Sequence, residues 1–289
     1  MKAWEITRSL KVFTAERAPI GVTLGLALAL CAGPWALAGR DSPALLRSVA
    51  ITFLGLVVLR IADDLHSLAH DRIASPARAL PSGRIAPRAL RAAAAVLLAV
   101  ALLLGLPWAS LALGLLASYY AGYYALASRL SVALRPPLVN AVFAAIPIVV
   151  GLVGGNAGPP SASLLALFFW LSAVGHDYAH DVHAVGEAPA GEESCSAALG
   201  PRRTAALGLL CYAGALVAAV CATRQAAAAG DQPVLFVVSL VALFGYVAYL
   251  LARLVVRPTR AAARRLYVSG FACFAVPSLL LGLDRLLWW

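Results

Sequence analysis

Residues 233–255 read PVLFVVSLVALFGYVAYLLARLV, a continuous apolar run interrupted by one charged residue, Arg253. A helix needs about 20 residues to cross about 30 Å of hydrocarbon, so this run is long enough to span a membrane. Comparable runs of Ala, Leu and Val recur along the chain. They lack the alternation of apolar and polar residues that membrane β-strands need. The sequence therefore predicts an all-α, polytopic membrane protein.

Nine such runs are predicted to be transmembrane helices. They cover residues 18–39, 44–66, 89–106, 109–128, 137–155, 161–180, 204–225, 233–255 and 265–284. The connecting stretches are short and leave no room for a separate soluble domain. We therefore expect residues 1–289 to form a single transmembrane domain, with the nine helices around a central apolar cavity that opens near the cytoplasmic side.

The charge distribution predicts the orientation in the membrane. The chain is 62% hydrophobic and 12% charged, well below the charged share of about 25% in soluble domains. Lys and Arg favour cytoplasmic loops, and an internal N-terminus puts 19 of the 23 basic residues on that side. The net charge of +10 thus reports topology, and no nucleic-acid partner is expected. We expect a multi-pass protein of the inner (plasma) membrane, with its N-terminus and active site on the cytoplasmic side; its oligomeric state is not predicted.

Acidic residues and all five histidines gather at the ends of two predicted helices. The first group is Asp63, Asp64, His66, His70 and Asp71. The second group is His176, Asp177, His180, Asp181, His183, Glu187, Glu192 and Glu193. A charge near a helix centre costs on the order of 2.5–3.5 kcal/mol in a membrane, so charges grouped within such helices indicate a function.

The chemistry of the first group points to a metal and a phosphate. Converging carboxylates repel each other unless a cation lies between them, and oxygen ligands with room for phosphate oxygens suit Mg²⁺. A Pro/Gly-rich loop follows with Arg72, Arg78 and Arg84, whose guanidinium groups are suited to binding phosphate oxygens. Asp63 and Asp71 would be about 12 Å apart along a helix, which two or more ions bridging a diphosphate would span.

Two segments resemble the motifs of the UbiA superfamily of intramembrane prenyltransferases. Residues 63–72, DDLHSLAHDR, and residues 76–83, PARALPSG, resemble the first Asp-rich motif and its Pro-x-Arg-x-x-Pro-Ser-Gly tail. Residues 177–181, DYAHD, with residues 194–200, SCSAALG, are similar to the second motif. Ser67 stands where a middle Asp is common, and His176 stands where the second motif has a basic residue. Nine helices also fit, so the resemblance covers nearly the whole chain.

The resemblance implies roles for individual side chains. The implied catalytic residues are Asp63, Asp71, Asp177 and Asp181. The implied Mg²⁺ ligands are Asp63, Asp64, Asp71, Asp177 and Asp181. The residues implied to bind the prenyl diphosphate are Arg72, Arg78, Arg129 and Tyr124. The implied reaction is Mg²⁺-dependent transfer of a prenyl group from a polyprenyl diphosphate to an aromatic or lipid acceptor within the bilayer.

Three alternatives remain open from the sequence. In a terpene cyclase of the same superfamily, a double bond of the ionised isoprenoid takes the place of the acceptor. A di-iron membrane oxygenase would use the histidines as ligands, and a transporter would use intramembrane charges as an ion pathway. Neither the acceptor nor the isoprenoid length follows from the sequence.

Overall fold

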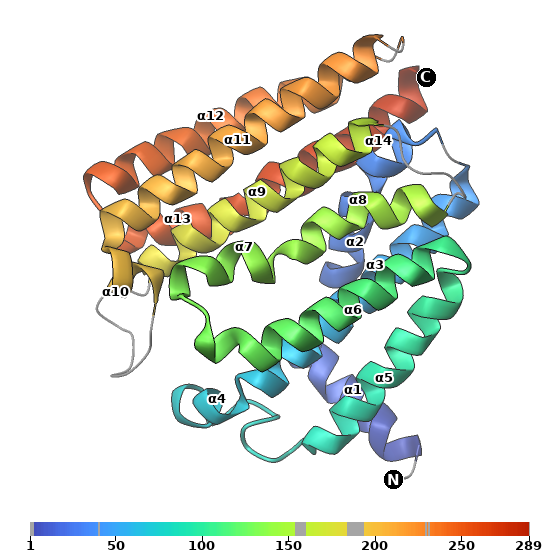
Figure 1. The fold of residues 1–289 in the computed structure, drawn as a ribbon, viewed down its shortest axis with the longest axis vertical. Helices are drawn as coiled ribbons and strands as arrows, with labels where there is room; N and C mark the ends of the chain where they lie inside the picture. The colour runs from blue at the N-terminus through green and yellow to red at the C-terminus, as the bar shows by residue number, and fades with distance from the viewer. Residues whose placement is uncertain are drawn as a thin grey trace.

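The computed structural model describes residues 3–39, 41–153, 160–183, 194–228, 230 and 232–288. In these ranges the chain is all-α, and its long helices lie side by side as one bundle (Figure 1). The helices are α1 (Ala3–Arg17), α2 (Ile20–Leu37), α3 (Ser42–His66), α4 (Leu68–Ala74), α5 (Pro87–Leu104), α6 (Trp108–Leu126), α7 (Arg135–Val139), α8 (Ala141–Val153), α9 (Pro160–His183), α10 (Cys195–Leu199), α11 (Pro201–Ala228), α12 (Val234–Val256), α13 (Arg260–Gly270) and α14 (Ala272–Trp288). Two 3₁₀ turns, η1 (Ala127–Arg129) and η2 (Val132–Leu134), separate α6 from α7.

Within the described ranges, six segments are long and apolar enough to cross a membrane. They are Ile20–Leu37, Ser42–His66, Pro87–Leu104, Val132–Val153, Pro201–Ala228 and Val234–Val256. Each corresponds to a predicted span. The other three predicted spans correspond to α6, α9 and the region of α13 and α14, which are helical but are not among the six. The protein is therefore an all-α, polytopic membrane protein, and the count of nine spans stays a prediction.

Close helix packing depends on small residues. A Cβ atom at Gly208 would lie 3.1 Å from the carbonyl oxygen of Gly175, and one at Gly175 would lie 3.0 Å from that of Gly208. The backbones of α9 and α11 therefore approach more closely than larger residues would allow. A Cβ atom at Gly282 of α14 would lie 2.7 Å from the Cβ atom of Ala32 of α2. These contacts join α9 to α11 and α14 to α2.

The helices break at points that apolar periodicity does not predict. The second predicted span, α3, ends at His66. Ser67, the next residue, has a φ of −81° and a ψ of 1°, and its hydroxyl donates a hydrogen bond to the carbonyl of Asp63 at 2.9 Å. Asp71 then lies on the short α4, so the continuous helix assumed between Asp63 and Asp71 is not formed. A similar break at Phe271 divides the predicted 265–284 helix into α13 and α14.

The turn between α7 and α8 is fixed by side chains from two neighbouring helices. Each donates a hydrogen bond to a carbonyl of the 133–139 segment. From α6, Tyr119 donates to Leu138 (2.9 Å) and Tyr120 donates to Val139. From α9, Trp170 donates to Pro137 (2.8 Å) and Tyr178 donates to Ala133 (2.7 Å). Asn140 is therefore held at the end of this turn, facing the acidic end of α9.

Candidate functional site

The four aspartates expected to be catalytic come from three elements. Asp63 ends α3, Asp71 lies on α4, and Asp177 and Asp181 lie one turn apart near the end of α9. Asp71 lies close enough to Asp63 for the two charges to repel, and Asp63 in turn repels Asp177. Asp177 is also repelled by Asp181. The fold thus links the two sequence motifs into one continuous set of like charges.

Asp63 and Asp64 face different surroundings although they are adjacent. Both carboxylate oxygens of Asp64 accept hydrogen bonds from Arg17 of α1, at 2.7 and 2.8 Å, and the side chain is 5% exposed. Asp63 makes one contact of 3.2 Å with Arg60, and its side chain is 47% exposed. The Arg17–Asp64 ion pair therefore connects α1 to α3. Asp63, in contrast, keeps a carboxylate oxygen that can still coordinate a metal ion.

The loop after α4 brings Arg78 to the first motif. The Arg78 guanidinium contacts both oxygens of the buried Asp71 carboxylate at 3.1 and 3.2 Å. Glu16 of α1 fixes the loop, because both of its oxygens accept from the backbone N–H of Ala79 at 3.1 Å. Gly83 has a φ of +79°, which favours glycine at this turn. The Pro-x-Arg-x-x-Pro-Ser-Gly segment is thus shaped to hold an arginine beside Asp71.

Asn140 positions the second motif. Its amide nitrogen donates to Asp177 at 2.6 Å and to the carbonyl of Pro136 at 2.8 Å. Asp181 accepts from the backbone N–H of Cys195 at 2.8 Å, which ties α10 to the end of α9. The pKa of the Cys195 thiol is raised to about 12 by burial and by the charge of Asp181. The thiol therefore stays protonated near neutral pH.

A small pocket of about 230 Å³, with both polar and apolar lining, lies beside the second motif. Asp177, His180 and Asp181 line it from α9, and Arg135 lines it from the start of α7. Arg135 was not predicted as a site residue. The basic residue predicted for this part of the chain was Arg129. Arg129 lies on η1 and is exposed. The basic residue that the fold brings to the second motif is Arg135.

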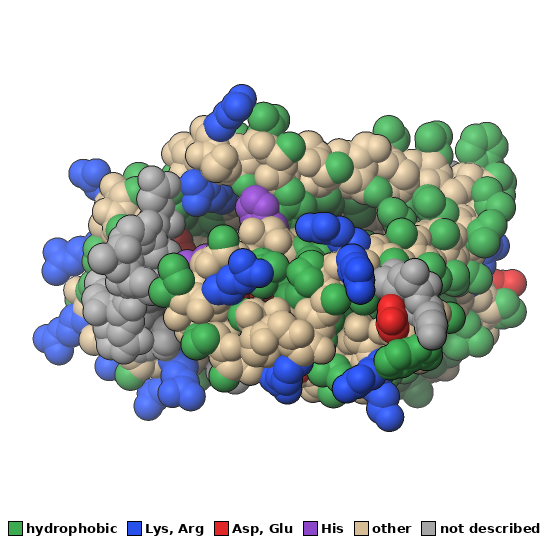
Figure 2. Space-filling view, turned by 90° about the horizontal axis from the view of Figure 1, so that it is seen from below, with side chains coloured by type: hydrophobic (Ala, Val, Ile, Leu, Met, Phe, Trp, Pro, Cys, Tyr) green, Lys and Arg blue, Asp and Glu red, His purple; other side chains and the backbone are tan. Residues whose placement is uncertain are grey.

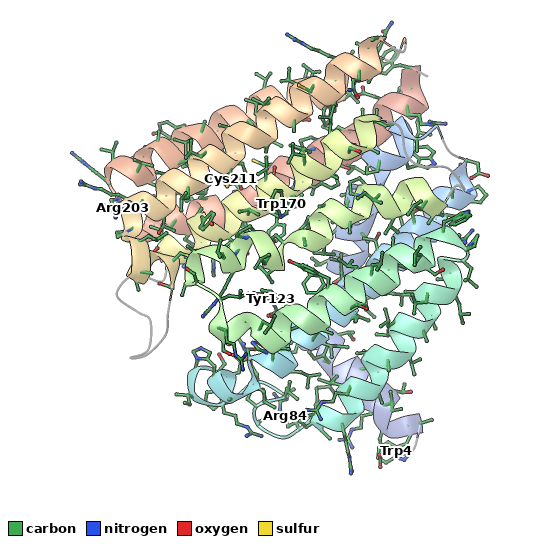
Figure 3. The ribbon with its side chains drawn as sticks, in the orientation of Figure 1. Trp4, Arg84, Tyr123, Trp170, Arg203 and Cys211 are labelled. Atoms are coloured by element: carbon green, nitrogen blue, oxygen red, sulfur yellow. The ribbon has the colours of Figure 1, made fainter. Side chains whose placement is uncertain are left out.

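An apolar cavity of about 260 Å³ begins next to Asp63. Helices α3, α5, α6 and α8 line it, and small side chains leave the space open: Gly55, Ala62, Ala117, Ala121 and Ala145. The two tyrosines that line it are Tyr120 and Tyr124, and the Tyr124 ring lies 5.0 Å from the His66 ring. Tyr123 lies on the part of α6 that faces α7 (Figure 3). Its hydroxyl lies within the range of electrostatic interaction with both Asp63 and Asp177. The aromatic cluster therefore lies between the acidic motifs and the cavity.

The remaining predicted residues are more dispersed. Arg72, His70 and His180 are exposed. His176 is buried, with its ring 4.4 Å from that of Phe271. Glu187, Glu192, Glu193 and the side chain of His183 lie outside the described residues. Among the described side chains, no three His, Cys, Asp or Glu residues form a group that could hold a metal ion alone.

The donor set fits a hard divalent cation that is shared with a phosphate ligand. The available donors are carboxylate oxygens, which suit Mg²⁺, and the nearby thiol is protonated. Mg²⁺ is usually held by one or two carboxylates together with water and substrate phosphates. Mutually repelling aspartates beside Arg78 and Arg135 match this pattern better than an all-protein metal cage.

Comparisons with known proteins agree with this arrangement. The profile of the UbiA prenyltransferase family matches residues 22–276. The structure of a digeranylgeranylglyceryl phosphate synthase superposes with a TM-score of 0.73 at 16% identity, over 96% of this chain and 99% of that one. An apo UbiA homologue from Aeropyrum pernix K1 gives 0.69 at 16% identity, over 93% and 98%. No curated protein matches the sequence. The two structures show a shared fold over nearly the whole chain.

Proposed function

The chain belongs to the UbiA prenyltransferase family, and on this premise we propose that it transfers a prenyl group from a polyprenyl diphosphate to an acceptor in a Mg²⁺-dependent reaction. The observation that carries the proposal is that both motifs border the same apolar cavity. In its wall, the Tyr124 ring lies 5.0 Å from the ring of His66 of the first motif, and the Tyr120 hydroxyl bonds to the 139–142 segment, whose Asn140 holds Asp177. Two like charges gathered there need a cation and its ligand to balance them.

The proposed binding mode divides the substrate between two environments. The diphosphate lies among Asp63, Asp71, Asp177 and Asp181, and the prenyl tail extends from Tyr120 and Tyr124 into the cavity. Mg²⁺, when bound, neutralises charge on the diphosphate oxygens and stabilises it as a leaving group. Asp64, which the resemblance also implies as a ligand, instead holds Arg17 in the described geometry.

The chain's own side chains then act on the two halves of the bond that breaks. The carbon–oxygen bond of the prenyl diphosphate breaks, and the electron pair leaves with the diphosphate. Arg78 and Arg135 supply positive charge to it, and stabilising developing charge in this way is usually the largest catalytic contribution. The faces of Tyr120 and Tyr124 stabilise the allylic cation. The apolar wall excludes water, so the acceptor forms the new bond and releases a proton.

The pocket of about 230 Å³ beside Asp177 belongs to the proposed diphosphate site, because Asp177, Asp181 and Arg135 line it. We further propose that residues 1–289 act as one domain, and that the acidic motifs face the cytoplasm because most Lys and Arg residues lie on their side of the membrane.

The proposal can be tested with purified protein in nanodiscs. Geranyl, farnesyl and geranylgeranyl diphosphate are supplied with a panel of aromatic and lipid acceptors, with and without Mg²⁺, and prenylated product is measured. We expect Mg²⁺-dependent product from the wild type and a loss of about 10²-fold or more in Asp63→Asn. Asp41→Asn is a matched control, because Asp41 caps the opposite end of α3 and Asn caps equally well.

Three outcomes would each contradict one part of the proposal. Unchanged turnover in Asp63→Asn would remove the metal site. A cyclic product formed without an acceptor would identify a cyclase. Turnover that is equal with and without Mg²⁺ would exclude the proposed role of the aspartates.

A further inference from the structure

A second pocket, of about 490 Å³ and with both polar and apolar lining, lies beyond the tail of the first motif, whose Gly83 lines it. It is enclosed by the N-terminal helix α1, the loop that precedes α5 and the first turn of α5. Arg8 lines it from α1, Arg84 from the loop and Arg88 from α5. Glu5 is the one acidic residue among the described residues of its lining. The pocket therefore has an excess of positive charge.

Two of these arginines have no competing partner in the described ranges. Arg8 and Arg88 are exposed, and no hydrogen bond or ion pair joins either of them to another described side chain. Arg84 donates to the carbonyl of Ala77 at 2.9 Å and lies 3.5 Å from Glu16, which fixes it at the pocket edge with its side chain 58% exposed. The guanidinium groups of Arg8 and Arg88 are thus available to an anion from outside the protein. Arg84 is already engaged through Nε and Nη2 and can add only its remaining N–H groups.

The start of α5 adds to this attraction. Its first turn contains no acidic residue, and no side chain caps it. Ala86, Arg88 and Ala89 of this turn line the pocket. The backbone N–H of Arg88 and the helix dipole favour an anion at this position. Pro87 has no N–H, and the N–H of Ala89 donates to the carbonyl of Ala86 at 2.9 Å. The effect supplements the arginines and does not replace them.

The pocket lies where a membrane span begins. Arg88 is the second residue of α5, and Pro87–Leu104 is one of the candidate spans. Trp4, on the rim, is 56% exposed, as is typical of a tryptophan at the level of lipid headgroups. Figure 3 shows Trp4 and Arg84 on the same edge of the molecule, beside α1 and the start of α5. An anion at this depth is most readily supplied by a lipid.

Apolar surface continues from the pocket along α5. Val96, Val100 and Leu103 are exposed at helical spacings of four and three, which gives acyl chains a continuous face. Phe13 is buried against Ile61, Ile85 and Leu90, so α1 is held against the bundle and one wall of the pocket is fixed. Figure 2, which looks onto this face, shows Lys and Arg side chains outnumbering Asp and Glu.

We propose that this pocket binds the phosphate headgroup of an anionic membrane lipid, with Arg8, Arg84 and Arg88 as its ligands and the acyl chains against α5. The occupant is an anionic phospholipid because the arginines match a phosphate and the apolar face matches the attached chains. The site contains none of the four proposed catalytic aspartates, and of its three arginines only Arg84 belongs to the loop that carries Arg78.

Native mass spectrometry of the detergent-purified full chain tests the proposal. Short-chain phosphatidylglycerol, phosphatidylcholine and inorganic phosphate are titrated separately, and bound adducts are counted. We expect phosphatidylglycerol to bind more tightly than phosphatidylcholine. In an Arg8→Gln/Arg88→Gln double variant this affinity should fall by about 25-fold, at roughly five-fold per basic residue.

The controls separate this site from general basic charge. An Arg202→Gln/Arg203→Gln variant removes two exposed arginines at the start of α11, far from Arg84 (Figure 3), and should keep wild-type affinity. Arg88→Lys keeps the charge and should retain most of the binding even if the double variant folds poorly. Equal binding of the two lipids, equal loss in the α11 variant, or displacement of phosphatidylglycerol by an equal concentration of inorganic phosphate would overturn the proposal.

Discussion

A phenylalanine at position 55 should shorten the isoprenoid that the protein accepts. Gly55 lies in the cavity wall, and a Cβ atom there meets nothing within 4 Å. The wall of α3 from Ile51 to Ala62 follows about 16 Å of helix. An extended chain of three bonds advances about 3.5 Å, so a four-bond isoprene unit takes about 5 Å and about three units fit. Gly55→Phe leaves about 10 Å of this length, enough for two.

The size of the effect follows from sterics and not from hydrophobic burial. Because a prenyl tail enters from lipid, whose chains are as apolar as the cavity, burying one more unit there gains little. Forcing that unit against an added ring resembles overpacking, which costs about 1–3 kcal/mol. At 1.4 kcal/mol per factor of ten, kcat/KM for farnesyl diphosphate should fall about 5- to 150-fold. Geranyl diphosphate, which is one unit shorter, should be affected little.

The assay is competitive turnover with equal amounts of geranyl and farnesyl diphosphate, with the two products separated by mass. Gly245→Phe is the matched control, because Gly245 is exposed on α12, a Cβ atom there also meets open space, and the residue does not line the cavity. An unchanged product ratio in Gly55→Phe, or the same shift in Gly245→Phe, would show that the tail does not occupy this cavity.

Three further predictions concern residues that hold the fold or the site in place. Asp64→Asn weakens a buried ion pair with Arg17 and should lower the free energy of unfolding by about 3 kcal/mol, while turnover per folded molecule is retained. Thermal unfolding measures the change in stability. Loss of turnover without a loss of stability would refute this prediction. Asn140→Ala removes the donor to Asp177 and should lower Mg²⁺-dependent kcat/KM about 10-fold or more, whereas wild-type kinetics would deny Asn140 a positioning role. Asp284→Ala removes the acceptor for two backbone N–H groups at the start of α12 and should cost about 2 kcal/mol with normal turnover; unaltered thermal unfolding would count against this cap.

The sequence predicts where the helices lie better than where they break. Continuous apolar runs predict α2, α3, α5 and α12, because a span needs length and composition and both are local properties. The break at Ser67 depends on a hydroxyl that bonds to the carbonyl of Asp63, and apolar patterning carries no such signal. Helix α1 was not predicted, because its stability depends on Phe13 packing against residues far along the chain.

The site could be predicted in part. The Asp-rich motifs and the Arg78 loop are contiguous in sequence, so their resemblance to a family is readable. Asn140 and Arg135 belong to neither motif, and they reach Asp177 only because α7 is turned toward α9. The pairing of Asp64 with Arg17 joins residues 47 apart. Such partners are set by tertiary packing. Their only signals in the sequence are polar residues near two prolines, as for Arg135 and Asn140, and a basic residue just before a span, as for Arg17.

A double-mutant cycle tests most directly whether Asp63 and Asp177 act on one metal-bound diphosphate. The measured quantity is the affinity for a non-hydrolysable prenyl thiodiphosphate in the presence of Mg²⁺, for the wild type, Asp63→Asn, Asp177→Asn and the double variant. Each single substitution should weaken binding about 10-fold or more. The double variant should bind only slightly less tightly than the weaker-binding single variant, because the effects of substituting two residues that hold one ligand do not add. Losses that multiply in full, or wild-type affinity in either single variant, would contradict a shared site.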